Sequence, residues 1–216
     1  MLRHVSRGLA WPLAIALVCV AAPSTEVAAD DPWALLKKPG HTVLMRHANA
    51  PGYGEDPPGI DLKNCALQRN LDEAGKTQAR LVGDEFRKRG FRRVRMVSSQ
   101  FCRALDTAKL MDLGPVEQRP VLNYFNFDDM AQVDKLARET KQFMKSIPAN
   151  QLAVLVTHIS NIKALVSVSP DSGEMVWCTS SHRARSRSTV AFARRSDEQS
   201  GGTQCRDSIM AAGCAI

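Results

Sequence analysis

The chain has 216 residues, of which 44% are hydrophobic and 24% charged, and its formal net charge is +7. This length and composition predict a globular protein with one substantial core and leave little room for two full domains. The positive charge favours anionic partners. A nucleic-acid partner is not indicated, because the sequence has no recognisable binding motif and no interleaved aromatic residues.

The first 29 residues have the pattern of a secretory signal peptide. Arg3 and Arg7 precede the apolar run LAWPLAIALVCVAA, and the small residues at 27–29 form a cleavage site. A membrane anchor is the alternative, but the run is shorter than the roughly 20 residues of a spanning helix. We expect a periplasmic or secreted protein with no stable membrane span after signal removal. Residues 30–40 are interpreted as a linker.

Two strands and two helices are predicted in the next part of the chain. Residues 41–47, HTVLMRH, form a short apolar run between Gly and Pro-Gly, which is typical of a buried strand. Residues 51–70 are rich in Pro, Gly, Asp and Asn, and a long loop of this kind commonly carries function. A helix over 73–89 follows an aspartate cap, and a second strand over 94–99 leads into a second helix over 101–113.

The following elements complete the alternation of strands and helices. The segment 116–125 can hold an edge strand that a proline interrupts. Asp128 or Asp129 can cap a third helix, which ends before the next proline. Residues 152–158, LAVLVTH, have the uninterrupted apolar character of a central parallel strand, and a short helix over 160–168 comes next.

This alternation predicts an α/β fold with three layers, in which a parallel-dominated central sheet carries helices on both faces. Ligands of such sheets bind at the carboxyl ends of the strands. We assign residues 41–177 to this domain. Residues 178–216 form an atypical tail rich in Arg and Ser, without a sustained period, for which disorder is the default expectation.

Five cysteines remain if the signal peptide is removed, namely Cys65, Cys102, Cys178, Cys205 and Cys214. The number is odd, so at least one thiol stays free or pairs between chains in an oxidising compartment. No cysteine spacing fits a structural zinc site. A cysteine-dependent phosphatase is excluded as well, because no cysteine has an arginine six residues later.

Cationic groups follow three of the predicted strands. Arg46 and His47 end the first, Arg103 lies just beyond the second, and His158 ends the strand 152–158. Guanidinium groups bind phosphate oxygens through two hydrogen bonds, and a neutral imidazole can attack phosphorus. A metal site is the rival interpretation, but neighbouring guanidinium groups repel a divalent cation and no carboxylate cluster compensates.

Four motifs at these positions resemble those of the histidine phosphatase superfamily, which has the phosphoglycerate-mutase-like fold. LMRHANAPG is similar to the RHG-type motif, RNLDEAGKTQA to the start of a helix with the pattern L-T-x-x-G-x-x-Q-A, VSSQFCRALDTA to S-S-x-x-x-R-A-x-x-T-A, and VTHISNI to the second histidine motif. They occur in the family's order and span residues 41 to about 177. The exported members that the chain resembles most include the lipopolysaccharide core heptose phosphatases.

The resemblance implies a role for each cationic residue. His47 is the nucleophile that becomes phosphohistidine, and Arg46, Arg103 and His158 form the phosphate pocket. We place Asn49 with the substrate-binding residues. Many members carry a glutamate as general acid where this chain has Asn123. Three aspartates are therefore candidate proton donors, although each also fits a helix cap or a solvated loop: Asp61, Asp128 and Asp129.

The resemblance also places Cys65 and Cys102 near the pocket. A disulfide bond between them would close a loop of 37 residues and contribute about 3 to 4 kcal/mol on chain-entropy arguments.

The resulting hypothesis is a metal-independent, cofactor-free phosphomonoesterase that is exported and acts through phosphohistidine. Candidate substrates are phosphorylated small molecules or envelope glycolipids, among them an envelope sugar phosphate. A phosphohistidine protein phosphatase is one alternative, since its labile substrate needs no strong acid. A non-catalytic module that binds anions is the other.

Overall fold

The computed structural model describes residues 32–52, 56, 59–179, 190–191, 211–212 and 214–215. The predicted signal peptide, 1–29, lies outside this range, as does most of the predicted tail. Within the described residues, no helix combines the length and the apolar character needed to cross a membrane.

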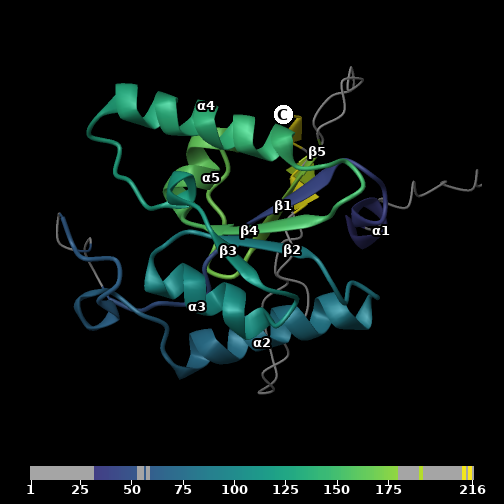
Figure 1. Ribbon diagram of the computed structural model, residues 1–216, viewed down its shortest axis with the longest axis horizontal. Coiled ribbons are helices and arrows are strands. Elements are labelled where there is room, and N and C mark those ends of the chain that lie inside the picture. The colour runs from purple at the N-terminus through teal and green to yellow at the C-terminus, as the bar shows by residue number, and fades with distance from the viewer. Residues whose placement is uncertain are drawn as a thin grey trace, which may run out of the picture.

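A six-stranded sheet forms the centre of the protein (Figure 1). Its order is β3-β2-β4-β1-β5-β8, with the bounds Val116–Gln118, Arg95–Ser98, Ala153–Thr157, His41–Arg46, Met175–Thr179 and Cys214–Ala215. The first four strands in this order are parallel to one another, and β5 runs antiparallel to β1. Two further strands, β6 (Val190–Ala191) and β7 (Ala211–Ala212), form a separate antiparallel pair.

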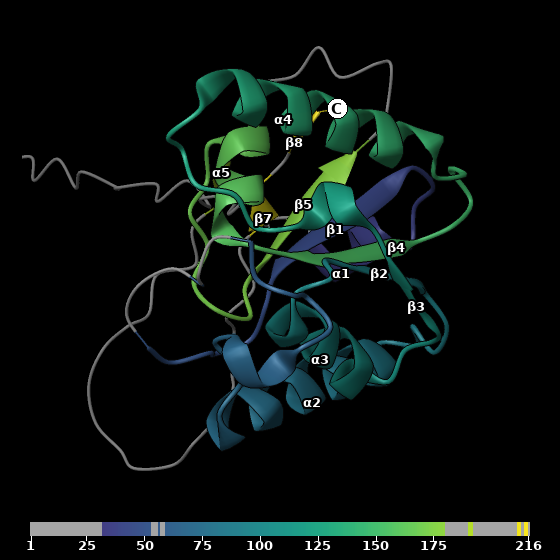
Figure 2. The ribbon, with the colours of Figure 1, turned by 60° about the vertical axis from the view of Figure 1, so that its left-hand side comes forward.

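Helices cover both faces of the sheet (Figures 1 and 2). On one face lie α2 (Glu73–Lys88) and α3 (Cys102–Met111), and on the other lie α4 (Met130–Ser146) and α5 (Ile159–Val166). Two 3-10 turns, η1 (Cys65–Leu67) and η2 (Pro120–Leu122), lie in the connections. The predicted three-layer α/β fold is confirmed.

Side chains alternate between two hydrophobic cores along each central strand. Val43 and Met45 of β1 face the core beneath α2 and α3, and Leu44 between them faces the core beneath α4 and α5. In β4, Val154 faces the core beneath α2 and α3, and Leu155 faces the core beneath α4 and α5. This two-residue period buries both faces, which explains why these strands read as continuous apolar runs.

The contact between α2 and α3 depends on a glycine. Gly83 lies in the middle of α2, and a Cβ atom added there would be 2.0 Å from the carbonyl oxygen of Met111, at the end of α3. The two helices therefore touch through backbone atoms. This explains why a glycine occupies a helix interior, where it otherwise costs stability.

Helix starts follow the capping pattern expected from the sequence. The carboxylate of Asp72 accepts a hydrogen bond from the backbone N–H of Gly75, and that of Asp129 accepts from Ala131 and Gln132. Each carboxylate satisfies N–H groups that the first helical turn leaves unpaired. Of the two candidate caps of the third helix, Asp129 is the one used.

Two predicted boundaries need correction. The segment 30–40, predicted as a linker, contains the helix α1 (Pro32–Leu36), whose Trp33 and Leu36 are buried in the core on the side of α2 and α3. The domain does not end at 177 either, because β5 continues to residue 179. From the predicted tail, β8 adds to the edge of the sheet beside β5, since main-chain pairing does not require a strong sequence pattern.

Candidate active site

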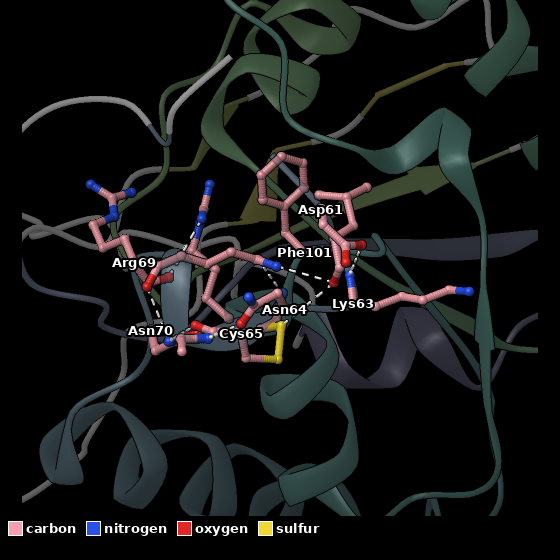
Figure 3. Close-up of a disulfide and its surroundings, with 12 residues drawn as sticks. Asp61, Lys63, Asn64, Cys65, Arg69, Asn70 and Phe101 are labelled. Atoms are coloured by element: carbon pink, nitrogen blue, oxygen red, sulfur yellow. Dashed lines mark hydrogen bonds between the residues drawn. A yellow bond between two sulfur atoms is a disulfide. The ribbon is translucent and has the colours of Figure 1, made fainter. Parts of the chain in front are cut away.

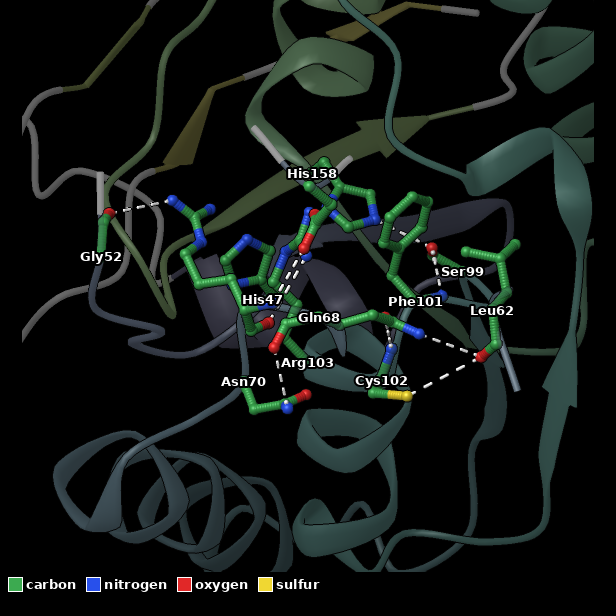
Figure 4. A network of polar contacts seen from close by, with 12 residues as sticks. His47, Gly52, Leu62, Gln68, Asn70, Ser99, Phe101, Cys102, Arg103 and His158 are labelled. Carbon is green, nitrogen blue, oxygen red and sulfur yellow. Dashed lines mark hydrogen bonds and ion pairs between the residues drawn. The ribbon is translucent and has the colours of Figure 1, made fainter. Parts of the chain in front are cut away.

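The carboxyl ends of β1, β2 and β4 bring the predicted site residues together. In the sheet, Arg46 is paired with Thr157 on the neighbouring strand. Because His47 and His158 each follow one of these two residues, their rings lie close, with centroids 5.3 Å apart (Figure 4). Ser99, at the end of β2, lies on the other side of His158.

A hydrogen bond fixes the orientation of the His47 ring. Its Nδ1 lies 2.8 Å from the carbonyl oxygen of Ala48, and a carbonyl can only accept, so Nδ1 carries the proton. The N–H of Ala48 in turn donates to Oγ1 of Thr107 on α3, at 3.0 Å. In the neutral ring, the lone pair is therefore on Nε2.

His47 is neutral over the physiological pH range. Only 3% of the residue is exposed. Burial, assisted by the charges of Arg103, Arg46 and Arg69, lowers the pKa of His47 to about 3, although the hydrogen bond to Ala48 opposes the change. A ring that is not protonated keeps the Nε2 lone pair available as a nucleophile.

His158 is fully buried, and its two nitrogens have different surroundings. Nε2 lies 2.8 Å from Oγ of Ser99. Nδ1 has no hydrogen-bond partner among the described residues. Burial, followed by the proximity of His47 and of the arginines, lowers the pKa of His158 well below its usual value, so this ring is neutral too.

Arg103 comes from the first turn of α3, and its side chain is 2% exposed. Its Nη1 donates to Oδ2 of Asp56 at 2.6 Å, and its guanidinium carbon lies 4.8 Å from the centre of the Phe101 ring. Burial lowers the pKa of Arg103, while Asp56 opposes this effect. Arginine nevertheless remains a cation in proteins, so the buried charge of Arg103 is matched by Asp56.

Arg46 and Arg69 add two more guanidinium groups. Nη1 of Arg46 donates to the carbonyl oxygen of Pro170 at 2.9 Å. Nη1 of Arg69 donates to the carbonyl oxygen of Gly52 at 3.3 Å, and its backbone N–H donates to Oδ1 of Asp56 at 2.8 Å. The charge of Arg69 lowers the pKa of both histidines. We did not predict Arg69 as a site residue, although it opens the motif RNLDEAGKTQA.

Several buried nitrogens in this region lack an acceptor. Six buried side-chain N or O atoms of the described residues have no hydrogen-bond partner, and four of them belong to this site: Nε of Arg46, Arg69 and Arg103, and Nδ1 of His158. Buried polar groups are normally paired, so such a concentration marks a functional site. An anion with several oxygens would supply the missing acceptors.

The charges also match a phosphoryl group. Three guanidinium cations and the carboxylate of Asp56 sum to a charge of +2, and both histidines are neutral. A phosphomonoester near neutral pH carries close to two negative charges. The pocket is therefore electrostatically complementary to a phosphoryl dianion.

The predicted disulfide bond between Cys65 and Cys102 is confirmed, with the Cα atoms 5.7 Å apart (Figure 3). It joins the long loop to the residue before Arg103. Beside it, the side-chain oxygen of Gln68 accepts from the N–H of Cys102 at 2.9 Å, and its amide group donates to the carbonyl of Leu62 at 3.1 Å. The loop that carries Asp56 and Arg69 is therefore tied to the start of α3.

Asn49 forms hydrogen bonds with a residue of α2 and with the cap of that helix. Its Nδ2 donates to the carboxylate of Asp72 at 3.2 Å, and its backbone N–H donates to Oε1 of Gln78 at 2.9 Å. Both contacts connect the segment after β1 to α2. The side chain thus helps to position the loop, and substrate binding by Asn49 stays a prediction.

The three candidate proton donors have other roles in the structure. Asp129 caps α4, Asp61 accepts from the N–H of Lys63, and Asp128 accepts from the side chain of Asn126. All three are exposed to solvent. The geometry gives no support to a catalytic role for them.

Metal ligation is not favoured by the described residues. They contain no group of three or more His, Cys, Asp or Glu side chains placed to hold a metal ion. The two histidines of the pocket instead have guanidinium groups as neighbours, which repel a divalent cation.

Fold and site together define a three-layer α/β protein in which two neutral histidines lie close to three arginines. The sequence model of the histidine phosphatase superfamily (branch 1) matches residues 43–154. The chain belongs to this superfamily. It has no match among the curated protein sequences.

Several solved structures are similar to this chain at low sequence identity. The product of the open reading frame Rv3214 from Mycobacterium tuberculosis is 18% identical, with a TM-score of 0.52, over 66% of this chain and 92% of that chain. Phosphoserine phosphatase from Entamoeba histolytica in complex with 3-phosphoglyceric acid is 15% identical, with a TM-score of 0.50, over 63% and 89%. The putative phosphohistidine phosphatase SixA from Agrobacterium tumefaciens is 16% identical, with a TM-score of 0.46, over 66% and 92%.

Proposed function

We propose that the protein hydrolyses phosphomonoesters through a covalent phosphohistidine at Nε2 of His47. One observation carries this proposal: the Ala48 carbonyl holds the proton on Nδ1, so the Nε2 lone pair of a neutral ring lies in a pocket of guanidinium groups. Membership of the superfamily supports the same chemistry.

The reaction has two displacement steps at phosphorus. Nε2 of His47 forms a bond to phosphorus as the bond to the ester oxygen breaks, and the leaving oxygen takes up a proton from solvent. A water oxygen then attacks the phosphohistidine and loses a proton to solvent, the N–P bond breaks with its electron pair returning to Nε2, and phosphate is released. In both steps, Arg46, Arg69 and Arg103 stabilise the charge on the oxygens of the transferring group. No step requires a metal ion.

The surroundings of the pocket favour substrates that need little acid catalysis. Asp56 is the carboxylate closest to the arginines of the site, and it accepts a hydrogen bond from Arg103. Asn123 stands where many relatives have a glutamate, and an amide cannot donate a proton in this way. A phosphohistidine protein phosphatase is therefore the second candidate, since an imidazole leaves from phosphorus readily.

We further propose that the enzyme acts outside the cytoplasm, on an envelope sugar phosphate or another phosphorylated small molecule or glycolipid. The signal-like pattern of residues 1–29 supports export. So does the disulfide bond, because such bonds persist in oxidising compartments.

The test is hydrolysis of p-nitrophenyl phosphate by the wild type and two histidine variants. His47→Ala removes the nucleophile and should lower kcat/KM by at least about 1,000-fold. His41→Ala changes the histidine at the opposite end of β1, outside the pocket, and should retain activity. Vanadate should inhibit the wild type, and chelators should leave its activity unchanged.

A second measurement detects the intermediate directly. Wild-type protein that is mixed with substrate and denatured at once should carry phosphate that is labile to acid and stable to base. If the wild type shows neither turnover nor labelled chain but still binds orthophosphate, the protein is a non-catalytic anion-binding module and the proposal is wrong.

A further inference from the structure

Ser99 lies between His158 and Asn123, and its hydroxyl has only one proton to donate. Oγ is 2.8 Å from Nε2 of His158 and 3.2 Å from Oδ1 of Asn123. It also accepts a hydrogen bond from the backbone N–H of Phe101, at 3.2 Å. Figure 4 shows Ser99 beside His158 and the loop at Phe101. The direction of the O–H bond therefore decides which neighbour receives the proton.

The direction of the Ser99 O–H bond determines which nitrogen of the His158 ring carries the proton. A neutral imidazole carries one N–H, and burial keeps this ring neutral. If the Ser99 hydroxyl donates to Nε2, the ring proton is on Nδ1. If the hydroxyl donates to Asn123 instead, Nε2 must carry the proton and donate to Ser99, and Nδ1 becomes a buried lone pair.

The surrounding contacts favour donation to His158. Oδ1 of Asn123 already accepts from the backbone N–H of Gln100 at 2.8 Å, and Nδ2 of Asn123 donates to Oε1 of Gln100 at 3.0 Å. The amide is thus satisfied without Ser99. The separation between Ser99 and His158 is also the shorter of the two, which indicates the stronger hydrogen bond.

The pocket favours the same tautomer. Nδ1 of His158 has no partner among the described residues, and it belongs to the set of unpaired nitrogens around the anion site. A phosphoryl oxygen accepts a hydrogen bond from an N–H but is repelled by a nitrogen lone pair. Only the tautomer with the proton on Nδ1 therefore adds a donor to the site.

We propose that Ser99 is a positioning residue, whose hydroxyl donates to Nε2 of His158 and thereby holds the ring proton on Nδ1 as a hydrogen-bond donor to the phosphoryl group. This inference rests on the proposed function for its catalytic meaning, but the tautomer itself can be measured without turnover.

Two substitutions and a matched control test the role of Ser99. Ser99→Ala removes the hydroxyl, Ser99→Thr keeps it, and Ser98→Ala makes the same change at the neighbouring buried serine, whose hydroxyl donates only to the carbonyl oxygen of Ser99. Thermal unfolding of each variant verifies that it is folded. Ser99→Ala should bind orthophosphate and hydrolyse p-nitrophenyl phosphate about 10- to 100-fold less well, as expected for loss of one donor to a charged group. Ser99→Thr and Ser98→Ala should stay near the wild type.

The tautomer is read from ¹H–¹⁵N correlation spectra of the histidine side chains with orthophosphate bound. The proton of His158 should be on Nδ1 in the wild type and in Ser99→Thr, and it should be distributed over both nitrogens in Ser99→Ala. A proton on Nε2 in the wild type overturns the inference, and so does a Ser99→Ala variant with unchanged spectra and activity. If the wild type binds orthophosphate but hydrolyses nothing, the proposed function fails, and the spectra still decide the role of Ser99.

Discussion

Acid should destabilise the native protein through His47, because the folded state holds this ring neutral. Burial and the neighbouring arginines lower the pKa of His47 to about 3, whereas a histidine in an unfolded chain has a pKa of about 6.5. Above pH 6.5, neither state binds the proton. Between pH 6.5 and 3, the unfolded state binds it and the native state does not, so stability falls as the pH falls.

The size of the effect follows from the two pKa values. Each pH unit between them changes the free energy of unfolding by about 1.4 kcal/mol. Lowering the pH from 8 to 5 should therefore cost about 2 kcal/mol for His47 alone. His158 contributes in the same direction, because burial lowers its pKa too.

Urea unfolding at pH 8 and pH 5 measures this cost in the wild type and in His47→Gln. The variant lacks the titrating ring but keeps His158 and the carboxylates, so the difference between the two pH dependences isolates His47. The variant should lose about 2 kcal/mol less than the wild type between these pH values. Equal losses in both proteins would refute the assignment of His47 as a buried neutral base.

Three further changes test the framework of the site. Asp56→Asn leaves the buried charge of Arg103 unmatched and should lower the free energy of unfolding by about 3 kcal/mol; a loss below about 0.5 kcal/mol in a urea melt would contradict this. Replacing both Cys65 and Cys102 by Ser reopens a loop of 37 residues and should cost about 4 kcal/mol, and a reductant should lower the Tm of the wild type alone. Gly83→Ala places a methyl group against the backbone of α3 and should cost about 2 kcal/mol or more; unchanged thermal stability would show that the helices can separate freely.

Several strands and helices could be predicted from the sequence, because the residues that specify each of them lie close together in the chain. The uninterrupted apolar run of β4 and the aspartate before α2 each act within a few residues, and the structure has the expected strand and helix at both places. The strand β5 was not predicted, since its last residues merge into the Arg- and Ser-rich segment and its partner β1 is more than 100 residues away in the chain. The helix α1 was missed because it is short and is held by Trp33 in the core.

The residues of the candidate site also fall into two groups, those that a sequence motif identified and those that only the folded structure reveals. The motifs around His47, Arg103 and His158 identified residues that the structure brings into one pocket, because motif spacing follows the ends of the strands. The roles of Asp56 and Arg69 could not be read in this way. They come from a loop without a repeating pattern, and their charges matter only because the loop folds back over α3.

The sequence by itself determined the central strands and the helices between them, the family, and the candidate residues Arg46, His47, Arg103 and His158, since these depend on local pattern and motif. Only the tertiary structure decided which nitrogen of His47 is free, that Asp56 matches the charge of Arg103, and that Asn49 is bonded to Asp72 at the start of α2. Proton positions and charge balance depend on distances of a few ångströms between groups far apart in the chain. Such distances exist only once the chain has folded.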